Sequence, residues 1–206
     1  MSFIYWLFRS SKTEIKVLAS VFAVLFILPL FAVVAITNAG LSAVAHALVS
    51  VNPITHLIEV HNADGKVVKT LKVSTVWPAS GVVTLEFGAP DPPYQPAHTG
   101  IDIANRHRQE GDPITVFMPG KVIFAGWQTG YGNVVYVDHG NNITSRYGHM
   151  QTIYAKKDDQ VKPGDVIGLM GQTGWATGPH VHFEIRVYDI PINPRTFMVG
   201  NPESGP

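Results

Sequence analysis

A long uncharged stretch near the N-terminus constrains this chain more than any other feature. No Asp, Glu, Lys or Arg occurs from Val17 to Ile58, and the most apolar part of this stretch covers residues 17–36. As an α-helix rising about 1.5 Å per residue, that part would be roughly 30 Å long, which matches the hydrocarbon core of a bilayer. We therefore expect a transmembrane helix over 17–36, kinked at Pro29.

The charges on either side of this segment predict its orientation. Arg9, Lys12 and Lys16 precede it against a single Glu14, and no basic residue follows before Lys66. By the positive-inside rule, the short N-terminus, residues 1–16, stays in the cytoplasm and the bulk of the chain lies on the other side of the membrane.

A cleaved signal peptide is the alternative to an anchor. Residues 45–47 read Ala-His-Ala, which has the small-x-small pattern of a cleavage site. The apolar run is longer than the ~7 to 15 residues of a usual signal core, which favours the uncleaved anchor. Either interpretation exports the C-terminal part of the chain.

The overall composition excludes several classes of protein. Fifteen basic and fifteen acidic residues leave no net charge, which argues against a nucleic-acid-binding protein. The chain has no cysteine, so disulfides and thiolate metal sites are excluded. Nineteen glycines and fifteen prolines, scattered along the sequence, indicate many turns and a β-rich body.

Two regions follow the apolar segment. Residues 37–76 are expected to form a spacer and then a β-hairpin turning at Asp64 and Gly65, a pair that supplies the positive φ angles of tight turns. Residues 77–206 read as one domain, in which a proline-rich loop leads into short alternating strands separated by Gly, Pro, Asn and Asp. This pattern predicts an antiparallel β architecture with one packed face.

The segment GPHVHFEIR aligns three polar side chains on one face of a predicted strand. His180, His182 and Glu184 alternate with the apolar Phe183 and Ile185, and residues two apart in a strand share a face. The polar face is either the wet side of an ordinary amphipathic strand or a reactive surface.

A second segment, HTGID, offers further metal ligands. His98 lies four residues before Asp102, with Gly100 between them to let the backbone bend. Imidazole and carboxylate both bind zinc at about 2.0–2.2 Å, and a catalytic site uses three protein ligands and an open position. One histidine of HVH would supply the third ligand, and His149 lies in a further motif, YGHM. The other histidines are expected in exposed or turn positions, namely His46, His56, His61, His107 and His139.

The motifs HTGIDIA, YGHM and GQTGWATGPHVHFEIR, in this order after WPASGVVTLEFG, resemble the lysostaphin-type (LytM-type) zinc metallopeptidases, which cut peptide cross-links in bacterial peptidoglycan. The resemblance covers residues 77–197. It implies a mainly β fold, a duplicated hybrid motif or lipoyl-like barrel-sandwich built from antiparallel sheet, with a groove across one sheet. It also implies one Zn²⁺ per chain, bound by His98, Asp102 and His182, with His149 and His180 as the catalytic histidines.

The chemistry of such a site assigns provisional roles to its neighbours. The pKa of a zinc-bound water falls towards ~7, so a nucleophile exists at neutral pH. We expect His149 to be the general base and His180 to orient water or stabilise the oxyanion, although the sequence leaves this division open. Glu184 is a candidate acceptor for an imidazole N–H, or else an exposed carboxylate. Trp175 and Tyr147 are candidate groove residues, with packing as the alternative for both.

The sequence thus predicts a zinc endopeptidase anchored by one N-terminal helix in the bacterial cytoplasmic membrane, with its catalytic domain outside, or secreted if cleaved near Ala47. Its expected partners are the stem or bridge peptides of peptidoglycan and the membrane, and no nucleic acid. The alternative is a non-catalytic wall-binding or hydrolase-activating module, which has no physical need for the complete set of site residues. A biotinyl or lipoyl carrier is disfavoured because no lysine marks a hairpin tip. The polar segment 105–112 has no assigned role.

Overall fold

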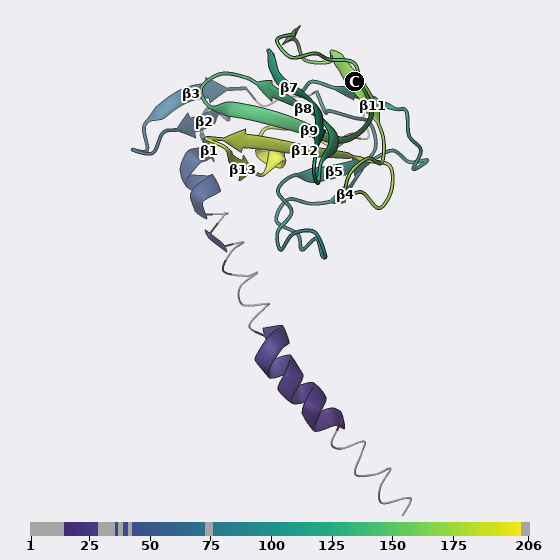
Figure 1. Cartoon of the computed structure of the whole chain (residues 1–206). Coiled ribbons are helices and arrows are strands. Elements are labelled where there is room, and N and C mark those ends of the chain that lie inside the picture. The colour runs from purple at the N-terminus through teal and green to yellow at the C-terminus, as the bar shows by residue number, and fades with distance from the viewer. Residues whose placement is uncertain (1–14, 29–35, 37–38, 41–42, 73–75, 203–206) are drawn as a thin grey trace, which may run out of the picture. The chain divides into compact units, whose positions relative to one another are not determined.

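A computed structural model gives the fold (Figure 1), and the residues it describes are 15–28, 36, 39–40, 43–72 and 76–202. The chain divides into two compact units, Met1–Gly40 and Leu41–Pro206.

In the first unit, residues 15–28 are helical and include the π-helical turn η1 (Ala23–Ile27). Within the described part of the chain, no helix is long and apolar enough to cross a membrane. Residues 29–35 of the helix expected over 17–36 lie outside the described residues, so the membrane anchor stays a prediction.

The regular secondary structure of the second unit is mainly antiparallel β, as predicted. Its described residues form a three-stranded sheet and a ten-stranded sheet. In chain order the strands are β1 (Val49–Val51), β2 (Ile58–His61), β3 (Val67–Leu71), β4 (Val82–Leu85), β5 (Ile101–Ala104), β6 (Pro113–Thr115), β7 (Gly120–Gln128), β8 (Gly132–Asp138), β9 (Ile143–Ile153), β10 (Gln160–Val161), β11 (Val166–Met170), β12 (Val181–Val187) and β13 (Ile190–Ile192). A short 3-10 helix, η2 (Pro194–Thr196), follows.

The small sheet contains the predicted hairpin and more. Strands β2 and β3 pair antiparallel around a turn in which Gly65 has a φ of 75°. The preceding segment is not a bare spacer, because residues 43–48 are helical and β1 pairs with β2. Ala45 and Leu48 belong to the same buried apolar cluster as the larger sheet. The residues before the hairpin therefore contribute to the core of this unit.

The larger sheet follows the order β10-β7-β8-β9-β12-β5-β4, with β13 beside β12 and β11 joining β6 and β9. Figure 1 shows β12 between β9 and β5. Strand β9 is eleven residues long, which lets its first part pair with β8 and β12 and its last part pair with β11. The sheet therefore branches at β9, close to His149.

Strand β12 is buried on both faces, unlike an ordinary amphipathic strand. Phe183 and Ile185 lie in the core as predicted, with no exposed surface. On the other face, Glu184 is also 0% exposed and His182 only 5%. The strand is central in the sheet, and side chains from neighbouring segments cover its polar face. A wet strand face is therefore the wrong interpretation of this motif.

Candidate metal centre

Strand pairing brings the two distant ligand segments together. Asp102 on β5 lies directly opposite His182 on β12, and Gly148 on β9 lies opposite His182 on the other side. Gly100 is needed for this approach, because a Cβ there would come within 2.3 Å of the carbonyl oxygen of Phe183. The glycine therefore permits close contact between backbones, whereas the sequence suggested that it provides a bend.

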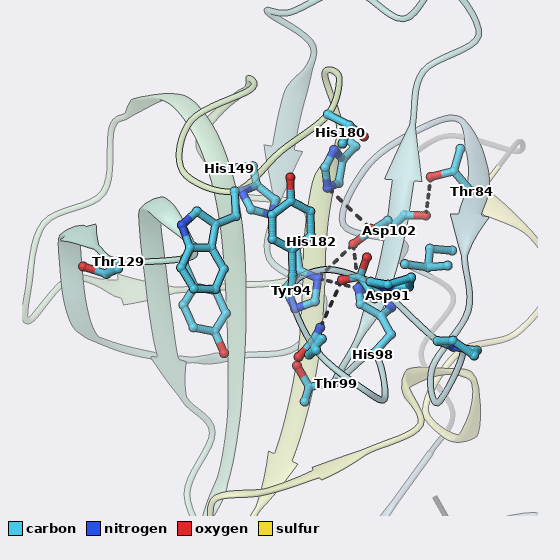
Figure 2. A pocket seen from close by; sticks show the side chains of 18 residues that line it. Thr84, Asp91, Tyr94, His98, Thr99, Asp102, Thr129, His149, His180 and His182 are labelled. Carbon is cyan, nitrogen blue, oxygen red and sulfur yellow. Dashed lines mark hydrogen bonds and ion pairs between the residues drawn. The ribbon is translucent and has the colours of Figure 1, made fainter. Parts of the chain in front are cut away.

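The three predicted ligands share one point in the groove (Figure 2). His98 Nε2 lies 2.9 Å from His182 Nδ1 and 3.1 Å from Asp102 Oδ1, and His182 Nδ1 lies 2.8 Å from Asp102 Oδ1. Ligands about 2.1 Å from a tetrahedral zinc ion are about 3.4 Å apart, so shifts of a few tenths of an ångström would admit the ion. The three side chains can hold one metal ion.

Hydrogen bonds behind the two imidazoles fix which nitrogen faces the centre. His98 Nδ1 lies 3.3 Å from the carbonyl oxygen of Glu86, and His182 Nε2 lies 3.0 Å from Glu184 Oε1. Both partners can only accept a hydrogen bond, so these nitrogens carry the protons. The opposite nitrogens face Asp102, and when unprotonated they form with its carboxylate a set of lone pairs that can bind a cation.

The pKa values of two ligands show that this site favours a positive charge beside the Asp102 carboxylate. Burial alone would lower the pKa of His182, but its hydrogen bonds with Asp102 and Glu184 outweigh this effect and raise the pKa to about 9. Burial alone would raise the pKa of Asp102, yet hydrogen bonds with His182 and His98 hold it well below its usual range. A divalent cation would replace the proton that His182 otherwise retains.

The two remaining histidines flank this point. His149 Nδ1 donates to the carbonyl oxygen of Thr173 at 2.7 Å, and His180 Nδ1 donates to that of Gly178 at 2.8 Å. Their ring centroids are 4.6 Å apart, and His180 Nε2 lies 3.5 Å from Asp102 Oδ2. Burial, with the nearby His180 and His182, lowers the pKa of His149 to about 4. His149 is therefore neutral at pH 7 and has Nε2 available as a proton acceptor.

The backbone at His149 departs from regular strand geometry. Its φ is 60°, a left-handed conformation that is costly for a residue other than glycine, by an amount on the order of 1 kcal/mol. Its N–H bonds to the carbonyl oxygen of Tyr131 at 2.7 Å, and the β8–β9 register shifts between Asn133 and Val135. Such irregularities re-aim a side chain next to a site.

Glu184 lies beneath His182 and is not the exposed carboxylate that the sequence left as an alternative. Its Oε1 accepts from Thr99 Oγ1 at 2.5 Å and from the Tyr131 hydroxyl at 2.8 Å, and its Oε2 accepts from Arg186 Nε at 2.6 Å. Burial would raise the pKa of Glu184, but the hydrogen bonds with His182 and Arg186 keep it well below its usual range. Glu184 is thus a buried anion that orients His182.

The sequence did not mark Thr99 and Arg186 as members of this site. The available signals were positional: Thr99 follows His98 directly, and Arg186 shares the strand face of His182 and Glu184. Burial and the Glu184 charge raise the pKa of Tyr131 to about 12, so its hydroxyl remains a donor.

The metal centre opens into a cavity of about 560 Å³. Trp175 lines it as expected, is 54% exposed, and stacks on Tyr94 with ring centroids 5.7 Å apart. Tyr147 does not line it, and its role is packing, the alternative that the sequence left open for this residue. Tyr147 has no exposed surface because it lies opposite Phe183 on the core side of the sheet, where its hydroxyl accepts from the N–H of Phe117.

His139 lies at the turn between β8 and β9, as expected, but its side chain is buried. It is only 8% exposed, with Nδ1 2.9 Å from the carbonyl oxygen of Pro119 and Nε2 2.8 Å from Ser145 Oγ. The other histidines expected at the surface agree better, since His46, His56 and His107 are exposed and His61 is partly exposed.

The comparisons with known proteins agree with this geometry. The sequence model described as peptidase family M23 matches residues 96–194. The DD-carboxypeptidase/endopeptidase Mpg of Neisseria meningitidis serogroup B is 38% identical over 106 residues, which cover 52% of this chain and 24% of the relative. The murein hydrolase activator NlpD of Escherichia coli is 34% identical over 123 residues, which cover 59% of this chain and 30% of the relative. The chain thus spans less than a third of the length of these relatives.

A solved structure covers the domain more fully. The catalytic domain of the prophage-encoded M23 protein EnpA from Enterococcus faecalis, crystallised as a point mutant, superposes with a TM-score of 0.53 and 35% sequence identity. The match covers 61% of this chain and 97% of that domain.

Proposed function

Because this chain belongs to peptidase family M23, we propose that it is a zinc endopeptidase that hydrolyses peptide cross-links of bacterial peptidoglycan. The convergence of His98, Asp102 and His182, with His149 and His180 beside them, carries this proposal. The open cavity next to them gives a peptide access to the site.

The donor set of two imidazoles and one carboxylate fits Zn²⁺, which when bound supplies Lewis acidity and lowers the pKa of a coordinated water. His149 Nε2 takes the proton of the attacking water, because this nitrogen is unprotonated at neutral pH. The hydrogen bond from His149 Nδ1 to Thr173 holds the ring in place while the proton is transferred to the leaving amine.

In this mechanism His180 stabilises the negative charge that develops on the carbonyl oxygen of the substrate. Its Nδ1 is held by the carbonyl oxygen of Gly178, so Nε2 points towards Asp102 and the metal centre. A proton on Nε2 would let His180 donate to the oxyanion that forms as the carbonyl carbon becomes tetrahedral.

The names of the relatives support peptidoglycan as the substrate and also favour a second candidate function. The similarity to NlpD, a murein hydrolase activator, suggests a module that binds the wall and stimulates another enzyme. Such a module needs neither a neutral buried histidine in a strained backbone conformation nor a complete ligand set. The geometry at His149 therefore favours hydrolysis by the chain itself.

We also propose that residues 17–36 anchor the protein in the cytoplasmic membrane with the catalytic domain outside. The lack of charge in this segment and the basic residues before it support the orientation. External protease should degrade the C-terminal domain in spheroplasts, and a domain protected until the membrane is lysed would refute this orientation.

Hydrolysis is tested by incubating the zinc-loaded full chain with purified sacculi of several wall chemistries and identifying newly freed amines by mass spectrometry. We expect one type of peptide bond to be cut, and no cutting by the His149→Ala variant. Unchanged sacculi together with stimulation of an added wall hydrolase would instead support the activator.

A further inference from the structure

The groove continues beyond the metal centre. A second cavity of about 240 Å³ is lined by Thr84, Thr177 and His180, and all three residues also line the cavity at the metal centre. Figure 2 shows Thr84 and His180 near Asp102, away from Thr129 at the other end of the site. The two cavities therefore form one groove, in which a peptide bound at the metal centre would extend past His180.

The far part of this groove is lined by Arg108, which comes from the polar segment 105–112. The base of this loop is braced by the buried Asn105, whose Nδ2 donates to the carbonyl oxygen of Gln109 at 2.7 Å and whose Oδ1 accepts from its N–H at 3.0 Å. The N–H of Arg108 bonds to the carbonyl oxygen of Asn105 at 3.1 Å, and its φ is 52°. The loop backbone thus holds Arg108 at the groove.

Among the residues that the structure describes, no carboxylate pairs with the guanidinium of Arg108. Within the described residues its side chain makes no hydrogen bond or ion pair, whereas Arg146 and Arg186 both pair with Glu184 and Asp189. The carboxylate nearest to Arg108 in sequence, Glu110, accepts a hydrogen bond from Gln151 Nε2 at 2.9 Å.

An unpaired guanidinium beside a peptide groove matches the planar geometry of a carboxylate and binds it with two parallel hydrogen bonds. We propose that Arg108 forms a subsite for a substrate carboxylate, so that the chain prefers peptides with a negative charge at this end of the groove. This inference rests on the proposed peptidase function and deepens it, because it names a chemical feature of the substrate. The carboxylate is either the C-terminal α-carboxylate of the peptide or a side-chain carboxylate.

The test uses cross-linked muropeptide dimers as substrates in four forms. The carboxylates are all free, all converted to amides, amidated only at the C-terminus, or amidated only on side chains. The zinc-loaded full chain is compared with Arg108→Gln and with Arg106→Gln. The second variant is a matched control, because it removes the same charge from the same loop at a residue that lines neither cavity.

We expect Arg108→Gln to lower kcat/KM by roughly fivefold to tenfold for the dimer whose carboxylates are all free. The effect is moderate because Arg108 is exposed, and an exposed ion pair contributes less binding free energy than a desolvated one. The fully amidated dimer should be cut equally by the wild type and this variant. Of the two partly amidated forms, one should be cut equally by the wild type and Arg108→Gln. The carboxylate that is amidated in that form is the one that Arg108 binds. Arg106→Gln should behave as the wild type on all four forms.

Two results would overturn the inference while hydrolysis stands. One is an Arg108→Gln variant that keeps the wild-type preference for free carboxylates, and the other is an equal loss in both variants, which marks long-range attraction without a subsite. If the wild type cuts none of the dimers, the proposed hydrolysis fails instead. Calorimetric binding of the same four forms then still tests Arg108, which should account for tighter binding of the free form.

Discussion

Glu184 offers the sharpest test of how the metal centre is held, through the substitution Glu184→Gln. Glutamine has nearly the same shape, and its Oε1 still accepts from His182 Nε2, Thr99 and Tyr131. Its amide nitrogen, however, cannot accept the hydrogen bond that Arg186 Nε donates to Oε2 at 2.6 Å. The substitution therefore places a donor against a donor and leaves the Arg186 charge without its buried partner.

The magnitude follows from this burial. Removing one member of a buried ion pair costs about 3–5 kcal/mol of unfolding free energy, and we expect about 3 kcal/mol because three of the hydrogen bonds survive. Loss of the negative charge also makes His182 Nδ1 a weaker base. Removing such a partner of a ligand lowers metal affinity by about 10- to 100-fold.

Two measurements on one pair of variants separate these effects. Urea unfolding of the metal-free protein gives the change in stability, and competition with a chromophoric chelator gives the zinc affinity. The control is Glu86→Gln, whose partner Arg195 lies 2.7 Å away in an exposed pair, with side chains 53% and 35% exposed. That variant should lose no more than about 1 kcal/mol and keep its zinc affinity.

If Glu184→Gln unfolds at the same urea concentration as Glu86→Gln and binds zinc as tightly, Glu184 neither stabilises the fold as a buried anion nor supports the metal ligand His182. A loss of stability with unchanged zinc affinity would retain Glu184 as a packing partner but reject its role in orienting His182.

Three further predictions concern the metal centre and His139. His182→Ala should lose zinc, as measured by elemental analysis, whereas His149→Ala should keep about one zinc per chain and lose at least about 100-fold in hydrolysis; a His149→Ala enzyme of normal activity would contradict the assigned base. Dialysis against a chelator should abolish hydrolysis and added Zn²⁺ should restore it, and persistent activity in metal-free protein would reject the metal mechanism. His139 has its pKa lowered to about 4, chiefly by burial, so below pH ~6.5 the unfolded chain takes up a proton that the folded chain does not. Unfolding free energy should therefore fall between pH 7 and pH 4, by up to about 3 kcal/mol more in the wild type than in His139→Gln, and parallel pH profiles would exclude this cause.

The sequence predicted those features that depend on local periodicity and on the order of motifs, namely the strands, a hairpin turn and the candidate site residues. Alternation correctly predicted the antiparallel strands of the C-terminal part, including β12 with its buried Phe183 and Ile185, and the hairpin turn at Gly65. The motif order pointed to the ligands and the two flanking histidines, which the structure brings together.

The sequence could not predict which polar side chains are buried by segments that are distant in the chain. Alternation places Glu184 on a polar face, but only the fold shows that Thr99 and Tyr131 close over it. His139 reads as a turn residue, yet the ring of Phe117, with its centroid 4.9 Å away, packs against it. The sequence left Tyr147 open between the groove and the interior; it lies opposite Phe183 in the core, and the left-handed backbone at His149 breaks the alternation that would put Tyr147 and His149 on one face.

The pairing of β5 with β12 has a consequence for the lifetime of the protein. Asp102 and His182 are 80 positions apart in the chain, so a cation bound by both would form a cross-link that closes a long loop. Separation of these strands would release the ion. Zinc binding would therefore raise the free energy of unfolding by about 4 kcal/mol when free zinc exceeds its dissociation constant roughly a thousandfold. Where zinc is scarce, the domain would open more often and be degraded by proteases, so metal supply would determine how long each copy survives as well as its proposed activity.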